Sequence, residues 1–370
     1  SGKVTAEGGG TGAGIGGVPE GSVTIGGTAM VTARGAGGGA GIGGGNTQLA
    51  GEIRINSGNV AAVGSGGSDG IGSGAGANAL AHKATIINGG SVTAQGSGAN
   101  VRNPVNDTAQ NSSGKIPLHR VVLKVGETPE AYAGQRVTGS TIWYGDTGTA
   151  ASPAVSWSAA VSGPDFQVDG ASGGLLSMYL PYTAASAVSE DAYYASVSAE
   201  LPDGSVYRRK VRANADDNLT ASLLADMTYQ LGIPAEIQAG TPENPVIIGH
   251  GVKADFDLSV ESNIQEGRTV EVSLSPSKGA MGAWGTFIMN NTAASHNGFT
   301  PQYRVQTPGG VQLYTEGSFW TFSGDDAETD GKRVKQGSVL LSGSQTLYAG
   351  SYTGNMTWHA VWDDPVVGGE

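Results

Sequence analysis

Short apolar strips separated by glycine and asparagine recur through the first hundred residues. The strip Val4-Thr5-Ala6-Glu7-Gly8 has counterparts that begin at Val31, Val60 and Val92, so the intervals are 27, 29 and 32 residues. Two further strips recur in phase with it. One lies at 23–25, 53–55 and 85–87, and the other is Gly-Ile-Gly at 14–16, 41–43 and 70–72. Three β-prone strips per repeating unit are typical of a solenoid.

Each strip is too short to be a free strand, so we expect it to pair with its copy in the next unit. Stacked strands lie about 4.8 Å apart, and the Val and Ile positions then form ladders inside the coil. Glycine suits the corners, where the chain needs a positive φ or a close backbone approach. The pattern therefore predicts a parallel β-helix over 1–100. Because residues 1–4 align with residues 57–60, we expect the chain to begin inside a longer solenoid.

The motif GAGIGG at 12–17 also fits the G-x-G-x-x-G fingerprint of dinucleotide-binding loops, and it returns at 39–44. A dinucleotide loop follows a strand, opens a helix and precedes an acidic residue by about 20 positions. The residues after Gly17 read VPEGSVTIGG, which predicts a turn and a strand instead of a helix. A fold that uses such a loop once also has no need of a copy one unit later. We therefore interpret GAGIGG as a β-helix corner and predict no cofactor.

The pattern changes near residue 100, after which all aromatic residues of the chain are found. Residues 101–116 are rich in Asn and Ser and predict a cap and linker. An antiparallel β-sandwich is predicted over 117–226, with a hairpin turn at Leu201–Gly204. One helical stretch is expected, at Leu219–Leu231, as a bridge to the next module. The predicted strands of this sandwich are 121–125, 141–144, 175–181, 193–199 and 205–212.

Short strand patterns punctuated by glycine continue to the end of the chain and predict a second sandwich over 227–370. The predicted fold class is therefore all-β, a parallel β-helix (solenoid) followed by two antiparallel β-sandwich (Ig-like) domains. The predicted strands of the last module are 246–248, 256–260, 269–274, 286–289, 302–305, 311–314, 319–322, 338–341 and 351–362.

Composition limits the setting of these modules. The chain of 370 residues contains no cysteine, which excludes disulfides and thiolate metal sites. Its net charge of −12, from 20 basic and 32 acidic residues, argues against a nucleic-acid partner. No apolar run approaches the roughly 18 residues that a membrane helix needs, and no signal peptide opens the chain. Any secretion or anchoring signal is expected outside this segment, in a longer chain.

Several stretches resemble large surface proteins of gut-type Gram-positive bacteria. GAGIGG, GGGAGIGGG and SVTAQGSG are similar to their Gly-rich repeats. GGLLSMYLPYTA with AYYASVSAELPDGSVYRRKV resembles the end of a Cna-B-like or carboxypeptidase-regulatory-like stalk sandwich. The ending LYAGSYTGNMTWHAVW resembles the closing strands of WxL-type modules. Trp358-His359-Ala360 and Trp320-Thr321-Phe322 depart from the W-x-L pair, which argues against peptidoglycan attachment by that route. The resemblance implies a secreted protein of the bacterial cell surface.

Cna-B-like domains often carry a Lys–Asn isopeptide cross-link, so the resemblance makes Lys124 with Asn214 or Asn218 a candidate pair. That chemistry requires an apolar site that lowers the pKa of a lysine, together with a nearby carboxylate. No residue stands out as the carboxylate. The favoured alternative is that Lys124 faces solvent.

Metal sites are not predicted. The acidic stretch Asp325–Gly331 begins like an EF-hand loop, but Gly337 stands where a bidentate glutamate is required. We therefore interpret it as a solvated hairpin loop. The five histidines, His82, His119, His250, His296 and His359, are scattered without a metal-ligand spacing.

Three pairs of adjacent aromatic residues are the candidate ligand-binding residues. Neighbours in a strand point to opposite faces, so one ring of each pair should lie outside the core. Outward rings can stack on sugars or on a host protein. The favoured alternative is that they fill domain contacts or lie under a loop. The pairs are Trp143-Tyr144, Tyr193-Tyr194 and Phe319-Trp320.

These features predict a non-enzymatic segment of an extracellular bacterial surface protein that serves as stalk or adhesin. One alternative is a recognition module for a host glycan or a host protein such as immunoglobulin. A less favoured alternative is a glycan-cleaving β-helix enzyme, which needs paired carboxylates. The repeats hold no aromatic residue to bind a sugar, and their only carboxylates are Glu7, Glu20, Glu52 and Asp69.

Overall fold

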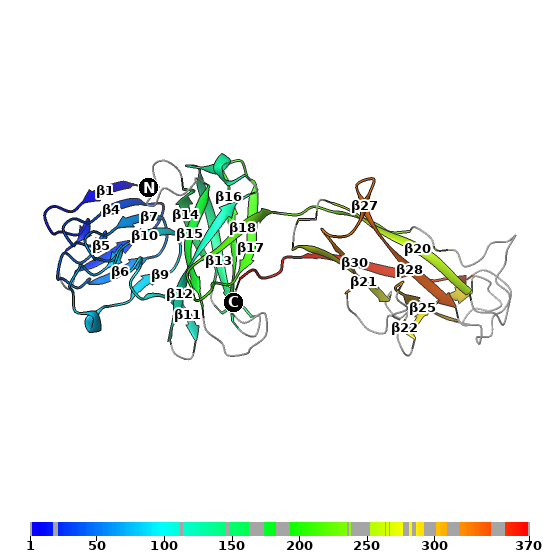
Figure 1. The fold of residues 1–370 in the computed structure, drawn as a ribbon. Coiled ribbons are helices and arrows are strands. Elements are labelled where there is room, and N and C mark those ends of the chain that lie inside the picture. Colours follow the sequence, from blue (N-terminus) through cyan, green and yellow to red (C-terminus); the bar gives the residue numbers. More distant parts are fainter. Residues whose placement is uncertain are drawn as a thin grey trace. The chain divides into compact units, whose positions relative to one another are not determined.

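The structure of the chain is a computed structural model that divides into two compact units. The first unit comprises Ser1–Asp226 and Val366–Glu370, and the second comprises Met227–Pro365 (Figure 1). Both units are all-β in their described residues, apart from two short 3-10 segments at Ala79–Ala81 and Pro129–Tyr132. The described residues are 2–17, 21–111, 114–126, 128–145, 149–151, 153–162, 174–182, 193–234, 237, 252–262, 264–265, 267–276, 281–282, 286–291, 301–308, 318–341 and 352–368.

The repeated strips of the first hundred residues pair in parallel at the register that their sequence similarity predicts. In the four-stranded sheet, Val4 lies opposite Val31, Val31 opposite Val60, and Val60 opposite Val92. The second strip pairs in the same way, and so does the Gly-Ile-Gly strip. The strands are β1 (Lys3–Glu7), β4 (Met30–Arg34), β7 (Asn59–Val63) and β10 (Ser91–Gln95); β3 (Ser22–Ile25), β6 (Glu52–Ile55) and β9 (Thr85–Ile87); and β2 (Ile15–Gly16), β5 (Ile42–Gly43) and β8 (Ile71–Gly72).

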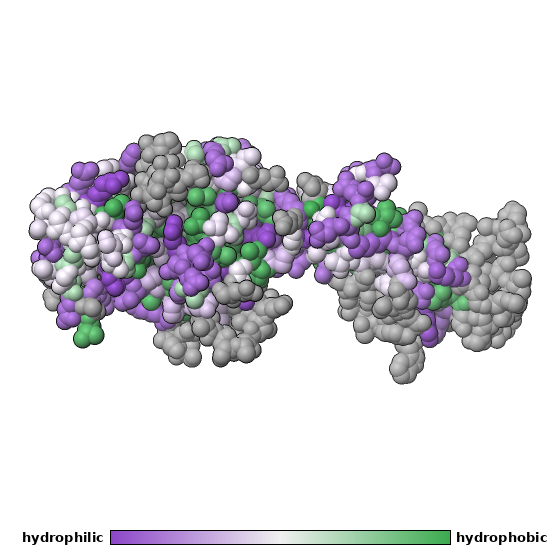
Figure 2. All heavy atoms as spheres, in the orientation of Figure 1, coloured by the Kyte–Doolittle hydropathy of each residue, from purple (hydrophilic) through white to green (hydrophobic). Residues whose placement is uncertain are grey.

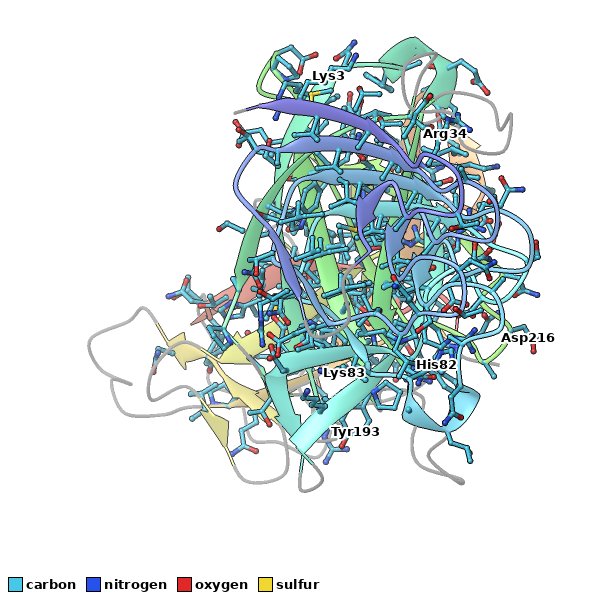
Figure 3. The ribbon with its side chains drawn as sticks, turned by 90° about the vertical axis from the view of Figure 1, so that its left-hand side faces the viewer. Lys3, Arg34, His82, Lys83, Tyr193 and Asp216 are labelled. Carbon is cyan, nitrogen blue, oxygen red and sulfur yellow. The ribbon has the colours of Figure 1, made fainter. Side chains whose placement is uncertain are left out.

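Burial follows the predicted inward direction of these side chains, with one exception. Val31, Val60 and Val92 are buried in one core with the isoleucines of the other two strips. Val4 is 46% exposed, contrary to the expectation that every valine of the strip points into a covered interior. The reason is that β1 is an edge strand, with β4 on one side and no other described strand on the other. Figure 3 shows the repeats in front, with Lys3 and Arg34 on β1 and β4.

The GAGIGG motif lies on a strand and a turn, as expected. Its Ile15 and Gly16 form β2, and the corresponding Ile42 and Gly43 of the second copy form β5. The next described strand after the first copy is β3, and no described residue between them is helical. Gly16 and Gly43 have φ values of 112° and 131°, which side chains other than glycine rarely adopt.

A half-buried ion pair links β6 to the strand that follows the repeats, β11 (Pro104–Asn111). The Arg54 guanidinium donates to the Asp107 carboxylate over 2.7 Å. Burial alone would raise the pKa of Asp107, but hydrogen bonds from Arg54 and Asn88 outweigh it and leave that pKa below its ordinary value. A carboxyl group with a lowered pKa stabilises the fold at every pH above its unfolded-state pKa of about 3.9. This contribution is lost as the pH falls through the folded-state pKa.

Replacing Asp107 by asparagine is therefore expected to lower the free energy of unfolding by about 1 kcal/mol at neutral pH, and by much less near pH 2. Urea unfolding of both proteins at several pH values measures the difference. Glu52 is the matched control, because it pairs with the same Arg54 over 3.6 Å and its side chain is 58% exposed. A Glu52→Gln effect as large as that of Asp107→Asn would contradict the assignment.

The repeats continue without interruption into the next module through a single eleven-stranded sheet (Figure 1). β9 pairs in parallel with β11, and β11 pairs antiparallel with β12 (Gly114–Val125). β12 in turn pairs with β15 (Leu175–Pro181) and with β18 (Leu219–Ala225), and β18 leads to the rest of the sheet. The remaining strands are β13 (Arg136–Tyr144), β14 (Val155–Ala160), β16 (Tyr194–Glu200) and β17 (Val206–Val211).

The strands predicted for this module are present, but the helix predicted at Leu219–Leu231 is wrong. That segment forms β18 and β19 (Gln230–Gly232). In β18, Ala221 and Leu223 are buried while their neighbours along the strand are not, which is the period of a strand. Pairing with β12 and β17 decides the conformation over the helix propensity of Leu and Ala. The predicted turn at Leu201–Gly204 is confirmed, because Gly204 donates to the Leu201 carbonyl over 2.9 Å with a φ of 83°.

The last residues of the chain return to the first unit. Val367 forms a parallel bridge with Val211, accepting from Arg212 N–H over 2.8 Å and donating to the Lys210 carbonyl over 3.0 Å. Its side chain packs on the core of the module that contains β12 to β18. The second unit is therefore an insertion, joined to the first unit at both of its ends.

The second unit consists of antiparallel sheets around one core. Phe256, Leu258 and Val260 of the larger sheet share this core with Val270, Val272 and Phe322 of a three-stranded sheet. The larger sheet contains β19, β20 (Val252–Glu261), β22 (Met281–Gly282), β23 (Thr286–Ile288), β25 (Gln302–Gln306), β27 (Glu328–Thr329) and β28 (Lys332–Leu341). The smaller sheet contains β21 (Thr269–Pro276), β26 (Ser318–Ser323) and β30 (Met356–Asp363), and β24 (Asn290–Asn291) pairs with β29 (Tyr352–Thr353). The strands predicted at 246–248 and 311–314 lie outside the described residues.

Candidate functional site

The first predicted aromatic pair has one buried and one half-buried ring. Trp143 is 2% exposed and packs in the core that the repeats also form. Its neighbour Tyr144 is half-buried on the opposite face of β13. The two side chains therefore divide between the faces of the sheet as the strand period requires.

Tyr144 and Tyr194, predicted from different parts of the chain, lie together. They are partners in the register of β13 and β16, and their rings stack with centroids 4.7 Å apart at 11°. Tyr193 precedes β16 with a φ of 49°, so it belongs to a turn and not to the strand. Each stacked ring covers one face of the other, which leaves at most one face of each for a ligand. Tyr193 is labelled in Figure 3.

The third pair lies on β26 of the second unit. Trp320 is 2% exposed, donates from Nε1 to the Gln336 carbonyl over 2.9 Å and contacts Phe256 edge-on. The Phe319 side chain lies outside the described residues. Ligand binding by any of the six aromatic residues stays a prediction.

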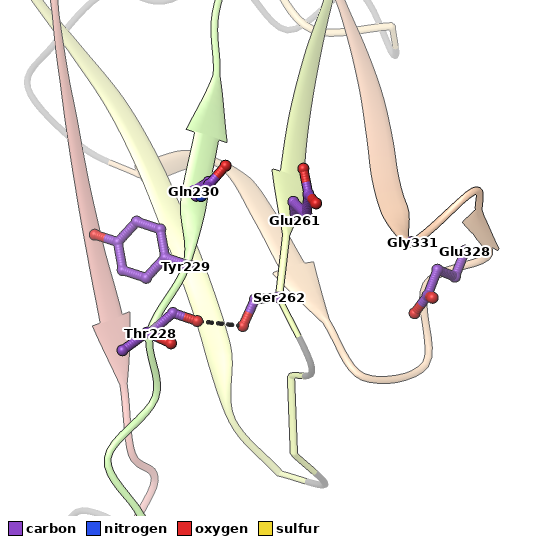
Figure 4. A pocket seen from close by; sticks show the side chains of 7 residues that line it. All are labelled: Thr228, Tyr229, Gln230, Glu261, Ser262, Glu328 and Gly331. Atoms are coloured by element: carbon purple, nitrogen blue, oxygen red, sulfur yellow. Dashed lines mark hydrogen bonds between the residues drawn. The ribbon is translucent and has the colours of Figure 1, made fainter.

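A depression of about 610 Å³ in the second unit is a further candidate site (Figure 4). Three segments that are far apart in the sequence build it at one end of the larger sheet. It lies where β19 begins, β20 ends and the β27–β28 hairpin turns. Most of its lining residues are exposed, so it is open to solvent. The lining residues are Thr228, Tyr229, Gln230, Glu261, Ser262, Glu328 and Gly331.

Hydrogen bonds fix the walls of this depression. Ser262 Oγ donates to the Thr228 carbonyl over 2.7 Å, which joins two of the three segments (Figure 4). Tyr229 OH donates to the Ala360 carbonyl over 2.8 Å, and its half-buried ring packs on the core. Arg333, 5% exposed, donates to the Ser262 carbonyl over 2.7 Å and pairs with Glu328 over 3.1 Å. The walls are therefore held in place before any ligand arrives.

The hairpin that borders the depression contains Asp325–Gly331, the acidic stretch whose sequence begins like an EF-hand loop. Thr329 pairs with Lys332, which leaves Asp330 and Gly331 as a two-residue turn with φ values of 52° and 74°. Two positive φ values in an Asp-Gly loop are those of a type I′ hairpin. The structure thus agrees with the interpretation as a hairpin loop, whose hydrophilic residues gather around β27 in Figure 2.

The carboxylate of Asp326 in that hairpin already has partners. It accepts from Ser323 N–H over 2.7 Å and lies 3.0 Å from Lys335. Burial raises the pKa of Asp326, but the hydrogen bond from Ser323 N–H and the nearby Lys335 lower it by more than that. The pKa of Asp326 therefore lies below its ordinary value. Within the described ranges, no group of three or more His, Asp or Glu side chains is placed to hold a metal ion.

Lys124 does not meet the requirements of the cross-link that the Cna-B-like resemblance implied. Its side chain is exposed, and its register partner on β18 is Ser222. Asn218 precedes Leu219, which lies opposite Val121, so it is about 13 Å from Lys124 along the strands. Asn214 instead donates to Asn218 over 2.6 Å.

The carboxylates considered for a glycan-cleaving site are divided among different sheets. Glu7 lies on β1, opposite Arg34, and Glu52 lies on β6. Asp69 is 1% exposed and pairs with Arg102. Glu20 lies outside the described residues. Of the histidines, His119 lies 3.0 Å from Asp217 and edge-on to Tyr182, while His82 precedes β9 (Figure 3).

None of the helices in the described part of the chain has the length and apolar character needed to cross a membrane. No protein-family model matches the chain, and no match was found among curated proteins.

Several solved structures match in part, including the following three. A chain of the chaperone–tip adhesin complex of CFA/I fimbriae matches at 12% identity with a TM-score of 0.25, over 70% of this chain and 78% of the other. A chain of the CsuC–CsuE chaperone–tip adhesion subunit complex of Acinetobacter baumannii matches at 12% identity with a TM-score of 0.23, over 62% and 86%. BcpA, the major pilin subunit of Bacillus cereus, matches at 13% identity with a TM-score of 0.17, over 66% and 67%. TM-scores this low do not establish a shared fold with any of the three.

Proposed function

We propose that this chain is a non-enzymatic structural segment of an extracellular bacterial surface protein, acting as a stalk that carries a display module. The three parallel sheets of the repeats are interpreted as the sides of one β-helix, and the sheets after them as two β-sandwiches. The surface setting is supported by the Gly-rich repeats and the sandwich stretches that resemble Gram-positive surface proteins.

The observation that carries the proposal is the continuous sheet that joins the repeats to the first sandwich. Backbone hydrogen bonds run from β9 through β11 to β12, so the repeats and the sandwich have no flexible joint between them. Side chains add to this connection. Ser177 N–H donates to Ser91 Oγ over 3.1 Å, and Arg136 donates to the Thr28 carbonyl over 3.1 Å. Such a body transmits force along its length, as a stalk must.

The insertion of the second unit fits the same role. Because Val367 returns to β17, the chain enters and leaves the second unit from the first one. Tension applied between the repeats and the end of the chain then passes through the first unit while the Val367 contacts hold. The second unit carries no load under that condition and is free to act as a display module.

Single-molecule stretching tests the stalk. The chain has no cysteine, so Gly9→Cys and Ala215→Cys, both at exposed positions, provide unique attachment points. We expect one rupture that releases about 700 Å of chain. Val105→Pro is the comparison, because it removes an N–H at the junction of β9, β11 and β12 and should split the rupture into two. Two ruptures in the parent chain, one of them confined to the repeats, would refute a continuous stalk.

A second candidate function is recognition of a host glycan or a host protein. The depression in the second unit favours it, because hydrogen bonds hold its walls in place before a ligand arrives. This function is compatible with the stalk, since the two reside in different units.

A further inference from the structure

We propose that the depression lined by Tyr229, Gln230, Glu261 and Glu328 binds a neutral saccharide. This inference deepens the display role proposed above by naming a ligand class, and it rests on that role only for its biological setting. The site has a volume of about 610 Å³, within the range of about 300–1,000 Å³ usual for small-molecule sites.

The charges of the site favour a neutral ligand. Two carboxylates line it, and each has its own cation: Glu261 lies 3.6 Å from Lys332, and Glu328 lies 3.1 Å from Arg333. Each lining carboxylate is therefore paired with a cation, so neither is an unpaired charge that would select a cationic ligand. A balanced set of charged groups still offers strong hydrogen bonds to neutral partners.

The hydrogen-bonding groups suit a ligand with many hydroxyls. Gln230 and Glu261 are register partners on β19 and β20, and their side chains stand next to each other in Figure 4. Carboxylates accept hydrogen bonds only, whereas the amide of Gln230 both donates and accepts. A saccharide hydroxyl supplies the donors that the carboxylates need and accepts from the amide.

The site is also prepared for binding. Ser262, Tyr229 and Arg333 already use hydrogen bonds to fix the three segments. Binding of a ligand therefore does not require these walls to become ordered, and the loss of conformational entropy that weakens binding at flexible sites is avoided. Because the depression is open, it can take a unit within a longer polysaccharide as well as a free end.

Saturation-transfer NMR on the full chain with cellobiose, lactose and N,N′-diacetylchitobiose tests the proposal. We expect saturable binding of at least one disaccharide with a Kd of about 1 mM. Glu261→Gln and Gln230→Ala should each weaken it by about tenfold or more, because the first replaces a charged acceptor oxygen by an amide donor and the second removes the Gln230 amide. Asp257→Asn is the matched control, since Asp257 lies on β20 and faces the same side, but outside the depression.

Three outcomes would overturn the inference. The first is that none of the disaccharides binds, and the second is that Glu261→Gln and Gln230→Ala bind like the Asp257→Asn control. The third is that trilysine binds at this site more tightly than any disaccharide, which would make the ligand cationic. The number of ruptures in the stretching experiment reports on the first unit, so failure of the saccharide proposal and failure of the stalk proposal are distinguishable.

Discussion

Replacing Gly43 by alanine is expected to lower the free energy of unfolding of the first unit by about 3–5 kcal/mol. Gly43 has a φ of 131°, and a Cβ placed on it would overlap the carbonyl oxygen of Gly72 in the next repeat. The backbone of that repeat cannot move away without breaking its own pairing, which includes Ile42 with Ile71. The substitution therefore combines an unfavourable φ with a backbone clash. Urea unfolding followed by far-UV circular dichroism measures it.

Gly27→Ala separates the two contributions. Gly27 also has a positive φ, of 65°, but a Cβ there has open space around it. We expect a cost of about 1–2 kcal/mol, from the left-handed conformation alone. If Gly43→Ala costs no more than Gly27→Ala, close backbone approach is not the reason for glycine in the Gly-Ile-Gly strip.

The register of the repeats could be predicted from the sequence because the similar strips of successive units can be aligned with one another. A strip such as Val31-Thr32-Ala33 pairs with its copy, so sequence similarity between units is equivalent to spatial contact. The exposure of Val4 could not be predicted from the strip itself. It depends on whether another strand covers β1, which is a property of the stack and not of the five residues.

The helix predicted at Leu219–Leu231 shows where local reasoning fails. Leu and Ala have high helix propensity, and the segment lies between two modules, where a bridging helix is common. In the structure, Ala221 and Leu223 are buried and alternate with less buried neighbours, which is the period of a strand. That strand conformation depends on pairing with the neighbouring strand β17 and with β12, which lies far earlier in the sequence.

The candidate site could not be predicted for the same reason. Its lining residues come from 228–230, 261–262 and 328–331, and no motif connects these segments. The aromatic pairs gave a local signal, and strand geometry correctly predicted that Trp143 and Tyr144 face opposite sides. The stacking of Tyr144 on Tyr194 required the register of two strands, which neither dipeptide contains.

The last Gly-Ile-Gly strip is covered by an ion pair that should be as important for stability as the interior glycines. After β8, the described part of the stack continues as an isolated bridge between Ile71 and Val101, with backbone hydrogen bonds from Gly70 and Ile71 to the carbonyls of residues 99 and 100. Asp69, 1% exposed, accepts from Ser73 N–H over 2.8 Å and from Arg102 Nε over 2.9 Å, and a second Arg102 nitrogen contacts its other oxygen. The pair thus satisfies a backbone donor and closes the end of the strip.

Arg102→Ala is expected to cost about 3–5 kcal/mol, because it leaves the Asp69 carboxylate buried without its cation. Asp69→Ala should cost less, about 3 kcal/mol, since the side chain of Arg102 is 27% exposed and can turn to water. The double variant should cost clearly less than the sum of the two, because the second substitution removes a group that the first left unpaired. Urea unfolding of the four proteins completes the cycle, with Glu52→Ala as an exposed control expected to stay within about 0.5 kcal/mol. Strict additivity would mean that Asp69 and Arg102 stabilise the fold independently, and the end of the strip would then be held by backbone hydrogen bonds such as that from Gly70 N–H to the Ala99 carbonyl.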